Sequence, residues 1–476
     1  MPPLVATFFC FLGIAGLFVL DRDRNAKTSP ALWLSVAWLA INGSRAVSQW
    51  LQPFGLGGGS IDSPEQRLEG SPLDRFVYFA LTLLAIAVLC QHHRKIGAVL
   101  RANWPIVLFF TYCAISTLWS EYPSVAFKRW VKAIGDISMV FVILTDTNCV
   151  AAIKRVFSRV GFVLLPLSIL FIKYYPELGR GYSPEGAVGY QGVTTSKNQL
   201  GMITLLLGIG LTWSLIQAFR HLNGKQKTRT IVAHLATLSM VAWLLWIADS
   251  ATSTYCFILA TILMLITSLS RHGRKPVVVY LLSASVLTLV LVAMFFDTGG
   301  TLLGSVGRDT TLTGRTDIWK LALGMSGNPI FGTGFESFWI GERLQKVWKI
   351  YRFHLNEAHN GYIEVYLELG WLGITLLGLL IVTGFRNVLA EFRRGSEIAS
   401  LKFAFLVVAV IYNLTESGFR ILDPVWIFFF FGIAASLDSS QIKAPVKVSA
   451  HRDKDARVQK LRYAKVLGSG YPRQTT

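Results

Sequence analysis

Long apolar segments alternate with shorter polar connections along most of this chain of 476 residues. Each segment is close to the length of about 20 residues that a helix needs to cross the hydrocarbon core of a bilayer. The pattern predicts an all-α polytopic membrane protein with about 12–13 transmembrane helices, because neighbouring short segments can merge. The segments lie near residues 3–20, 31–51, 75–90, 104–120, 130–145, 157–173, 198–218, 231–248, 252–270, 276–296, 362–385, 401–416 and 421–437.

The polar connections fall into two groups that alternate along the chain. One group is rich in Lys and Arg, and short loops of this kind stay on the cytoplasmic side of a membrane; it consists of 21–27, 92–95, 154–155, 220–229, 271–275, 386–394 and the tail 443–473. The other group should face outward, to the periplasm or the cell exterior; it consists of 55–74, 121–127, 173–197, 297–358 and 415–423. The same alternation places the N-terminus outside, and the first segment lacks the features of a cleaved signal peptide.

The outer connection before the third-last apolar segment is long enough to hold structure of its own. Aromatic and aliphatic residues recur at helical spacing over 316–325 and 335–350, which predicts two amphipathic helices lying on the membrane surface. We therefore divide the chain into an N-terminal transmembrane bundle, a loop with amphipathic helices, C-terminal transmembrane helices, and a basic cytoplasmic tail that touches anionic membrane lipid. The boundaries are 1–296, 297–361, 362–437 and 438–476.

The composition supports a membrane protein and argues against two other classes. Hydrophobic residues make up 53% of the chain, and the mean hydropathy is +0.49. The net charge of +19 does not indicate nucleic-acid binding, because most of the cations lie in loops between apolar segments. The cysteines lack the spacing of a metal site, so we expect small core residues at all five positions: Cys10, Cys90, Cys113, Cys149 and Cys256.

The stretch from Ala358 to Gly373 carries polar residues where the long outer connection returns to an apolar segment. Intramembrane or interfacial charge is costly, so His359 is a candidate for chemistry. A neutral imidazole, with a pKa near its ordinary value of about 6.5, can accept a proton from a hydroxyl group. The structural alternative is a helix cap, with Asn360 or Gly361 making the turn. We expect Glu364 behind the histidine, and Glu368 paired with a cation such as Arg420 or Arg45.

Several cations lie on the expected outer side. Guanidinium groups that converge at one membrane face suit a diphosphate, because each donates paired hydrogen bonds to phosphate oxygens. For any one of them the alternative is a snorkelling anchor at a helix end, or for Arg45 a partner of a buried carboxylate. Arg315 is favoured, since the sequence around it predicts the start of a helix. The candidates are Arg45, Arg129, Arg180, Lys197, Arg308 and Arg315.

Common catalytic motifs are absent from the sequence. It contains no P-loop, no HExxH motif, no nucleophile elbow and no acidic cluster of the kind that holds a divalent metal. We therefore expect neither a metal nor another cofactor.

Two motifs resemble a known family. His359-Asn360, followed after nine residues by Gly370-x-x-Gly373, resembles the histidine motif of the O-antigen ligase and Wzy polymerase family of bacterial envelope glycosyltransferases. The sequence from Gly314 to Trp319 resembles the arginine motif in the large periplasmic loop of that family. Three further segments resemble the ExoQ-like branch of exopolysaccharide polymerases: 42–50, 69–75 and 192–201.

The resemblance implies metal-independent, inverting glycosyl transfer at the periplasmic face of the inner membrane, with undecaprenyl-diphosphate-linked oligosaccharide as the substrate. It implies that Arg180 and Arg315 hold the diphosphate and that His359 activates the acceptor hydroxyl. Lys197, Arg308, Arg129, Asn360 and Arg45 would then help to bind the substrate. The resemblance also implies chain-length regulators and export proteins as partners.

Three functions stay open at this point. A polymerase would join lipid-linked repeats, and the ExoQ-like segments favour it. A ligase would transfer a lipid-linked glycan to lipid A core or another acceptor with the same motifs. A transporter or flippase for the lipid-linked glycan is disfavoured, because we find no internal repeat and the polar residues gather at one face.

Overall fold

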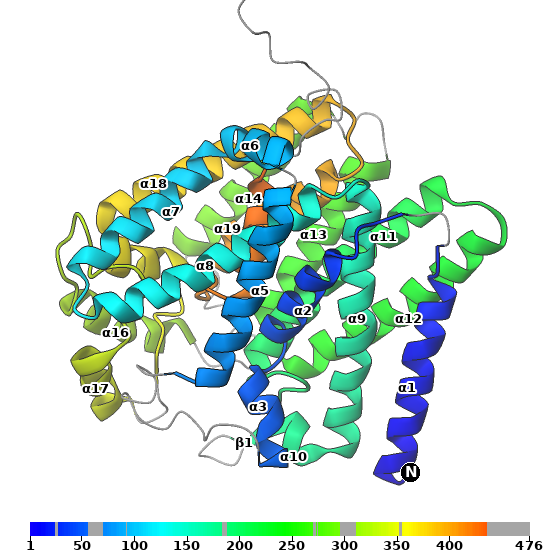
Figure 1. Ribbon diagram of the computed structural model, residues 1–476, viewed down its shortest axis with the longest axis horizontal. Coiled ribbons are helices and arrows are strands. Elements are labelled where there is room, and N and C mark those ends of the chain that lie inside the picture. The colour runs from blue at the N-terminus through cyan, green and yellow to red at the C-terminus, as the bar shows by residue number, and fades with distance from the viewer. Residues whose placement is uncertain are drawn as a thin grey trace, which may run out of the picture. The chain divides into compact units, whose positions relative to one another are not determined.

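The computed structural model describes residues 1–23, 27–55, 70–91, 93–182, 188–269, 273, 275–295, 311–351 and 355–435. Residues Met1–Ser436 form one compact unit (Figure 1). A second unit begins at Leu437 and lies outside the described residues.

The fold is all-helical and polytopic, which confirms the predicted fold class. Within the described residues, seven helices are long and apolar enough to cross a membrane, and a bent pair raises the number to as many as eight. The first member of the bent pair is Lys95–Ala102, in α6 (His93–Ala102). The second member is Trp104–Trp119, which comprises α7 (Trp104–Ser116) and η2 (Thr117–Trp119). The two members are bent by 81° relative to each other. The seven helices are α1 (Pro3–Leu20), α5 (Pro72–Gln91), α9 (Cys149–Tyr174), α11 (Lys197–His221), α12 (Gly224–Ala248), α13 (Ala251–Leu269) and α18 (Gly361–Arg393).

The sequence pattern predicted more spans because several apolar segments form short helices. The described apolar stretches of α2 (Leu32–Asn42), α14 (Pro276–Phe295), α19 (Ala399–Tyr412) and α20 (Pro424–Ile433) are shorter than 18 residues. The helix α8 (Pro123–Leu144) is long enough but carries four charged residues: Lys128, Arg129, Lys132 and Asp136. The remaining short helices are α3 (Val47–Leu51), η1 (Gln52–Phe54) and α10 (Pro176–Gly179).

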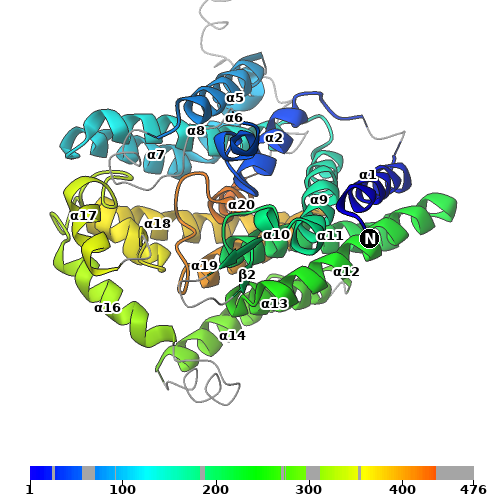
Figure 2. The same ribbon diagram turned by 90° about the horizontal axis from the view of Figure 1, so that it is seen from below.

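The helices of the compact unit pack around α11, α19 and α20. Every residue of α20 is buried, including four consecutive phenylalanines that begin at Phe428. In Figure 2, α5 and α8 lie on one side of this centre and α12 to α14 on the other. A helix that is apolar all round is stable only when other helices cover it, which explains the central place of α20.

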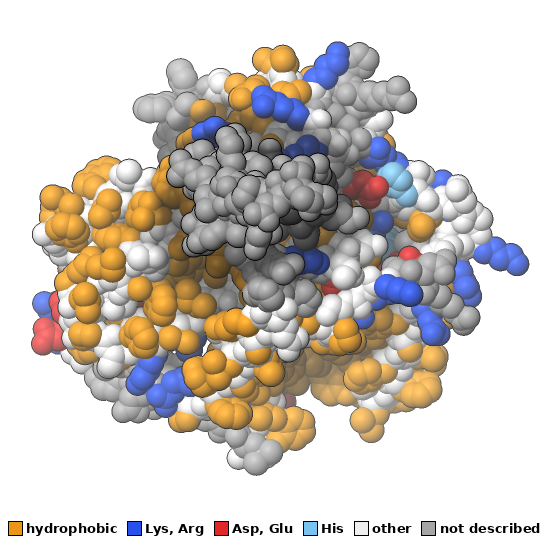
Figure 3. Space-filling model, turned by 45° about the horizontal axis from the view of Figure 1, so that its top comes forward, with side chains coloured by type: hydrophobic (Ala, Val, Ile, Leu, Met, Phe, Trp, Pro, Cys, Tyr) orange, Lys and Arg blue, Asp and Glu red, His pale blue; other side chains and the backbone are white. Residues whose placement is uncertain are grey.

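The loops gather at two opposite ends, in agreement with the predicted grouping. Among the connections expected in the cytoplasm, Arg155 donates to the carbonyl of Asp23 at 3.3 Å. Among those expected outside, Arg420 pairs with Glu357 at 2.8 Å. Figure 3 looks toward the end that carries α6, where Lys and Arg side chains spread over the upper and right parts of the view. Hydrophobic side chains dominate its left part.

A small hairpin, at the end of the bundle that we expect to face outward, departs from the all-helical prediction. Its strands β1 (Arg180–Tyr182) and β2 (Val188–Tyr190) are antiparallel, with Arg180 opposite Tyr190. The hairpin follows α10 and leads into α11.

The long outer connection contains α16 (Thr311–Gly324) and α17 (Gly341–Ile350), and two details of the prediction are wrong. The helix α16 begins four residues before Arg315, so Arg315 does not lie at a free helix start. The segment 335–340 is irregular, not helical. The apolar faces of both helices point into a small core and not only toward a membrane surface; its buried members are Ile318, Ala322, Phe338, Trp339, Leu344, Val347, Leu355, Ala358 and Leu367.

The helix α18 is broken at Gly370, where φ is 64° and ψ is −164°. This conformation is essentially restricted to glycine. A Cβ atom at this position would lie 2.3 Å from the carbonyl oxygen of Ile330. The segment 328–334 fills the break, because Gly334 N–H donates to Glu368 O at 2.8 Å and Trp371 N–H donates to Pro329 O at 2.9 Å. The break therefore costs few hydrogen bonds, which is how a broken helix survives inside a membrane protein.

The structure corrects two further predictions. Among the described contacts of Glu368, its carboxylate accepts from the backbone N–H of Glu336 at 3.0 Å, and it forms no ion pair with Arg420 or Arg45. Of the five cysteines, only Cys113 and Cys256 are buried, and Cys90 is exposed. Cys90 lies near the end of α5, where its side chain faces outward from the bundle.

Candidate active site

The segment before α18 holds His359 in a fixed and strained conformation. Its φ of 51° is uncommon for a residue with a side chain, and such strain persists only where the surroundings enforce it. The preceding residue is held on both sides: Ala358 N–H donates to Glu364 Oε1 at 2.5 Å, and Ala358 O accepts from Trp319 Nε1 at 2.8 Å. Glu364, in the first turn of α18, therefore positions the segment that carries His359, as the sequence predicted.

Asn360 caps the helix that follows. Its side-chain oxygen accepts from the N–H groups of Tyr362 and Ile363 at 3.0 and 3.1 Å. Its side-chain nitrogen donates to Leu414 O at 3.0 Å. These contacts use the side chain for structure, so they support the cap interpretation over substrate binding.

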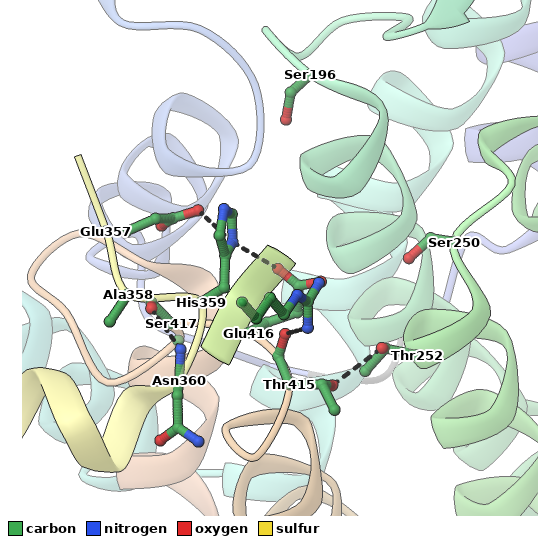
Figure 4. A network of polar contacts seen from close by, with 12 residues as sticks. Ser196, Ser250, Thr252, Glu357, Ala358, His359, Asn360, Thr415, Glu416 and Ser417 are labelled. Atoms are coloured by element: carbon green, nitrogen blue, oxygen red, sulfur yellow. Dashed lines mark hydrogen bonds and ion pairs between the residues drawn. The ribbon is translucent and has the colours of Figure 1, made fainter. Parts of the chain in front are cut away.

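The loop between α19 and α20 forms the other side of the site. Ser417 Oγ accepts from Asn360 N–H at 3.0 Å, which fixes this loop against the start of α18. The loop thereby brings Glu416 to the histidine (Figure 4). It also brings Arg420 to Glu357.

Five charged side chains form a chain of alternating sign, which we call the charge cluster: Arg315, Glu416, His359, Glu357 and Arg420. Arg315 Nη2 lies 3.1 Å from Glu416 Oε1, and Arg420 Nη1 lies 2.8 Å from Glu357 Oε2. His359 Nδ1 lies between the carboxylates, 3.0 Å from Glu357 Oε1 and 3.5 Å from Glu416 Oε2. These two contacts are ion pairs, since neither oxygen aligns with the ring N–H as a hydrogen bond. The histidine side chain is 23% exposed, so a substrate can reach it.

The two carboxylates change the expected protonation of His359. Burial alone would lower its pKa, but the contacts with Glu357 and Glu416 outweigh burial and raise the pKa to about 9. Burial would raise the pKa of Glu357, yet His359 and Arg420 lower it to about 2. The expectation of an ordinary histidine pKa is therefore wrong, because the sequence did not reveal the two carboxylates.

Both carboxylates contact Nδ1 of the imidazole, which leaves Nε2 as the nitrogen that a bound hydroxyl can approach. Carboxylates that fix one ring nitrogen determine the tautomer and the direction of the other. The arrangement can thus take up a proton at Nε2 once the ring is neutral.

The ligand atoms of Glu357, His359 and Glu416 lie within 4.8 Å of one another, a spacing that can also hold a metal ion. Arg315 and Arg420 already bind these carboxylates and add two positive charges, which oppose the binding of a further cation. The residues present therefore fit a salt-bridge cluster better than a metal centre.

The N-termini of α11 and α13 lie near the charge cluster. Thr252, in the first turn of α13, shares a hydrogen bond of 3.0 Å with Thr415, whose carbonyl accepts from Arg315. The start of α11 packs beside that of α13, since a Cβ at Gly201 would lie 2.7 Å from Ser250 Cβ. Figure 4 shows Ser196 and Ser250 across from His359 and Glu416. Helix N-termini carry partial positive charge, so this end of the bundle favours an anion.

Two of the predicted cations make their described contacts beside the charge cluster and not within it. Lys197 Nζ lies 3.9 Å from Asp249 at the link between α12 and α13. Arg180 Nε donates to Ile172 O at 3.0 Å, and its guanidinium lies 5.8 Å from the centre of the Tyr190 ring. Both residues belong to the same outer end of the bundle.

Two other predicted cations bind backbone carbonyls. Arg45 donates to Thr194 O at 3.2 Å and also to Leu178 O, so it partners the backbone and not a buried carboxylate. Arg129 donates to the carbonyl of Glu336. These contacts favour structural roles for both residues. Arg308 lies outside the described residues.

Sequence reasoning missed Glu357, Glu416 and Arg420 as members of the site. Their signal was present: Glu357 stands two residues before the histidine, and the other two lie in a short loop between the last apolar segments. Charges in such a loop are functional candidates in a membrane protein.

Comparisons with known proteins place part of the chain beside one family. Residues 235–378 match the model of the family described as O-antigen ligase. Over this segment the chain is similar to the O-antigen ligase family. The matched segment includes Arg315, Glu357 and His359, whereas Glu416 and Arg420 follow it. The chain is also 27% identical over 352 residues to the exopolysaccharide production protein ExoQ of Rhizobium meliloti (strain 1021), covering 71% of this chain and 77% of that protein. This similarity points to glycosyltransferase-like chemistry of the bacterial envelope.

Proposed function

We propose that the protein is an exopolysaccharide polymerase that joins undecaprenyl-diphosphate-linked oligosaccharide repeats at the periplasmic face of the bacterial inner membrane. The observation that carries the proposal is the charge cluster, which combines one histidine with two arginines at the outer end of the helices. The relative named for exopolysaccharide production supports a polymer as the product.

The reaction is an inverting glycosyl transfer in which one bond is exchanged for another. The acceptor hydroxyl attacks the anomeric carbon of the donor sugar on the face opposite the diphosphate, and a new glycosidic bond forms. The bond between that carbon and the phosphate oxygen breaks, and the donor's lipid diphosphate leaves with the electron pair. The proton of the acceptor hydroxyl passes to His359 Nε2 and then to solvent.

Neutral His359 is the active form in this scheme. With a pKa of about 9, only about one molecule in a hundred carries the neutral ring at pH 7. The same two carboxylates that lower this fraction make the neutral ring a stronger base and orient it, which favours proton uptake during attack.

The lipid diphosphate is a good leaving group here because positively charged side chains stabilise the negative charge that it gains. Arg315 and Arg420 belong to the charge cluster, and Arg180 in β1 and Lys197 at the start of α11 supply further positive charge. Guanidinium groups keep their proton and pair with two phosphate oxygens at once, so charge that develops on the leaving group is stabilised. The scheme needs no metal ion.

A ligase is the second candidate, because the family model that matches is described as O-antigen ligase. Both enzymes break the same donor bond, and they differ in the acceptor. Deleting the gene separates them: the proposal predicts loss of polymer with accumulation of single lipid-linked repeats. Full-length polymer retained on its lipid carrier would instead indicate a ligase, and unreacted repeats trapped in the cytoplasmic leaflet would indicate a flippase.

A further inference from the structure

An apolar cavity of about 470 Å³ lies between the N-terminal parts of α5 and α8, which pack side by side in Figures 1 and 2. Its apolar lining includes Phe76, Phe79, Phe127 and Val131. Each of the three phenylalanines is at least half exposed, so the cavity opens on an apolar part of the protein surface. A cavity of this kind suits an alkyl or isoprenoid chain.

Three cations also line this cavity: Arg75, Lys128 and Lys132. Lys128 and Lys132 are one turn apart on α8 and share a face. None of the three forms an ion pair with an acidic side chain among the described residues, and Arg75 Nε is buried without a hydrogen-bond partner. The neighbouring Asp74 is occupied, since its carboxylate accepts from the N–H and the hydroxyl group of Ser48.

The ligand that matches both properties is a lipid with a long apolar chain and a strongly anionic head. Three cations beside one carboxylate leave a surplus of two positive charges at the mouth of the cavity. A sugar-linked lipid diphosphate carries two negative charges, whereas a phospholipid such as phosphatidylglycerol carries one. Among the described residues Lys132 has only the Tyr78 ring as a partner, at 5.7 Å, and no carboxylate neutralises the three cations, so an anion that approaches them is favoured.

The cavity is separated from the charge cluster by α8 itself. Arg129 on α8 donates to the carbonyl of Glu336, whose carboxylate accepts from Ile421 N–H, beside Arg420. In the proposed reaction the donor's diphosphate must lie at the charge cluster, because its bond to the reacting carbon breaks there. The acceptor's diphosphate lies a whole repeat unit away from the hydroxyl that attacks, so its site must be removed from His359.

We infer that the cavity between α5 and α8 binds the lipid diphosphate of the acceptor, through Arg75, Lys128 and Lys132. This inference rests on the proposed polymerase function, which requires two lipid-linked substrates at once. It distinguishes the protein from a ligase that needs only one lipid diphosphate.

The direct test is the number of lipid diphosphates that bind. Undecaprenyl diphosphate is added to purified protein in nanodiscs, and bound lipid is counted by native mass spectrometry. Two molecules should bind to the wild type and one to Lys128→Ala/Lys132→Ala. The double variant Lys346→Ala/Lys349→Ala removes the same charge from exposed positions on α17 and should still bind two. One molecule on the wild type, two on the cavity variant, or equal displacement by phosphatidylglycerol would each overturn the inference.

An activity assay then separates this inference from the proposed function. With a lipid-linked acceptor, Lys128→Ala/Lys132→Ala should be about tenfold to a hundredfold slower at low acceptor concentration, because two charged contacts are lost. With an acceptor oligosaccharide that lacks the lipid diphosphate, the variant should equal the wild type. An equal loss of activity with both acceptors would overturn the inference. A wild type that is inactive with every acceptor would refute the polymerase function, and the number of bound lipid diphosphates would still test the inferred site.

Discussion

The imidazole of His359 is fixed by its neighbours in position and in charge. Two carboxylates hold its Nδ1, and each carboxylate is held in turn by an arginine. The histidine therefore sits in a cluster whose charge nearly balances, and its pKa rises to about 9. Sequence could predict this histidine and Arg315 from their motifs. It could not predict the carboxylate pair, because Glu357 and Glu416 come from separate segments that only the fold brings together.

The pH dependence of the rate follows from this protonation. If neutral His359 accepts the proton, the rate should rise by roughly tenfold per pH unit and level off near pH 9. Glu357→Gln removes a carboxylate that raises the pKa, so the plateau should begin at lower pH. Rates of the two proteins across pH 6–10 test this, with the exposed Glu342→Gln as the control. A rate that falls above pH 9 would show that the imidazolium is the active form.

Arg315 should matter through its charge at the leaving group. Arg315→Ala should lower kcat by about 100- to 1000-fold, the effect typical of removing one group that stabilises a developing anion. Arg343→Ala is the matched control, because Arg343 lies on α17 at the same end and pairs with the exposed Glu121. Its loss should change kcat by less than about twofold, because Arg343 forms no ion pair with a member of the charge cluster. Equal losses in both variants would contradict a specific role for Arg315.

At the scale of elements, the break in α18 explains why the sequence motif contains Gly370. Gly370 is required because its backbone adopts a conformation reserved for glycine while the segment 328–334 lies against it. The break also ties the outer connection to the membrane helices. Periodicity predicted a helix through this region, and only tertiary contacts explain why it is interrupted. The same contacts explain why 335–340 is not helical, since this segment packs beside the break.

A single methyl group should disrupt this break. Gly370→Ala would add backbone strain of about 1–3 kcal/mol and a clash with the backbone of Ile330. We expect a clear fall in thermal stability of the detergent-solubilised protein. Gly378→Ala lies in the same helix with nothing near its added Cβ, and should be neutral or slightly stabilising. An unchanged melting temperature in Gly370→Ala would contradict the break as described.

At the scale of the whole compact unit, hydrophobic patterning located nearly all the helices. It failed on their lengths, because α2, α19 and α20 are shorter than a span and are stabilised by burial within the bundle. Charge patterning predicted which loops share an end. The arrangement of the helices within the bundle, with α20 at the centre, could not be predicted from the sequence. It depends on how side chains from many segments pack.

The sidedness of the two ends can be measured in cells. In a background without native cysteines, Glu342→Cys on α17 should react with a membrane-impermeant maleimide once the outer membrane is permeabilised. Arg220→Cys at the end of α11 should react only after lysis. Both positions are exposed, so accessibility depends on the side of the membrane. The reverse pattern would place the charge cluster in the cytoplasm and contradict the proposed function.

The most direct test of the central claim is reconstitution of the reaction. Purified protein is incubated with a lipid-diphosphate-linked repeat unit in EDTA, and wild type is compared with His359→Ala and Arg315→Ala. The account predicts a ladder of polymer for the wild type, unaffected by EDTA, and none for either variant. A ladder that persists in His359→Ala, or a wild type that transfers the glycan only when lipid A core is added, would contradict it.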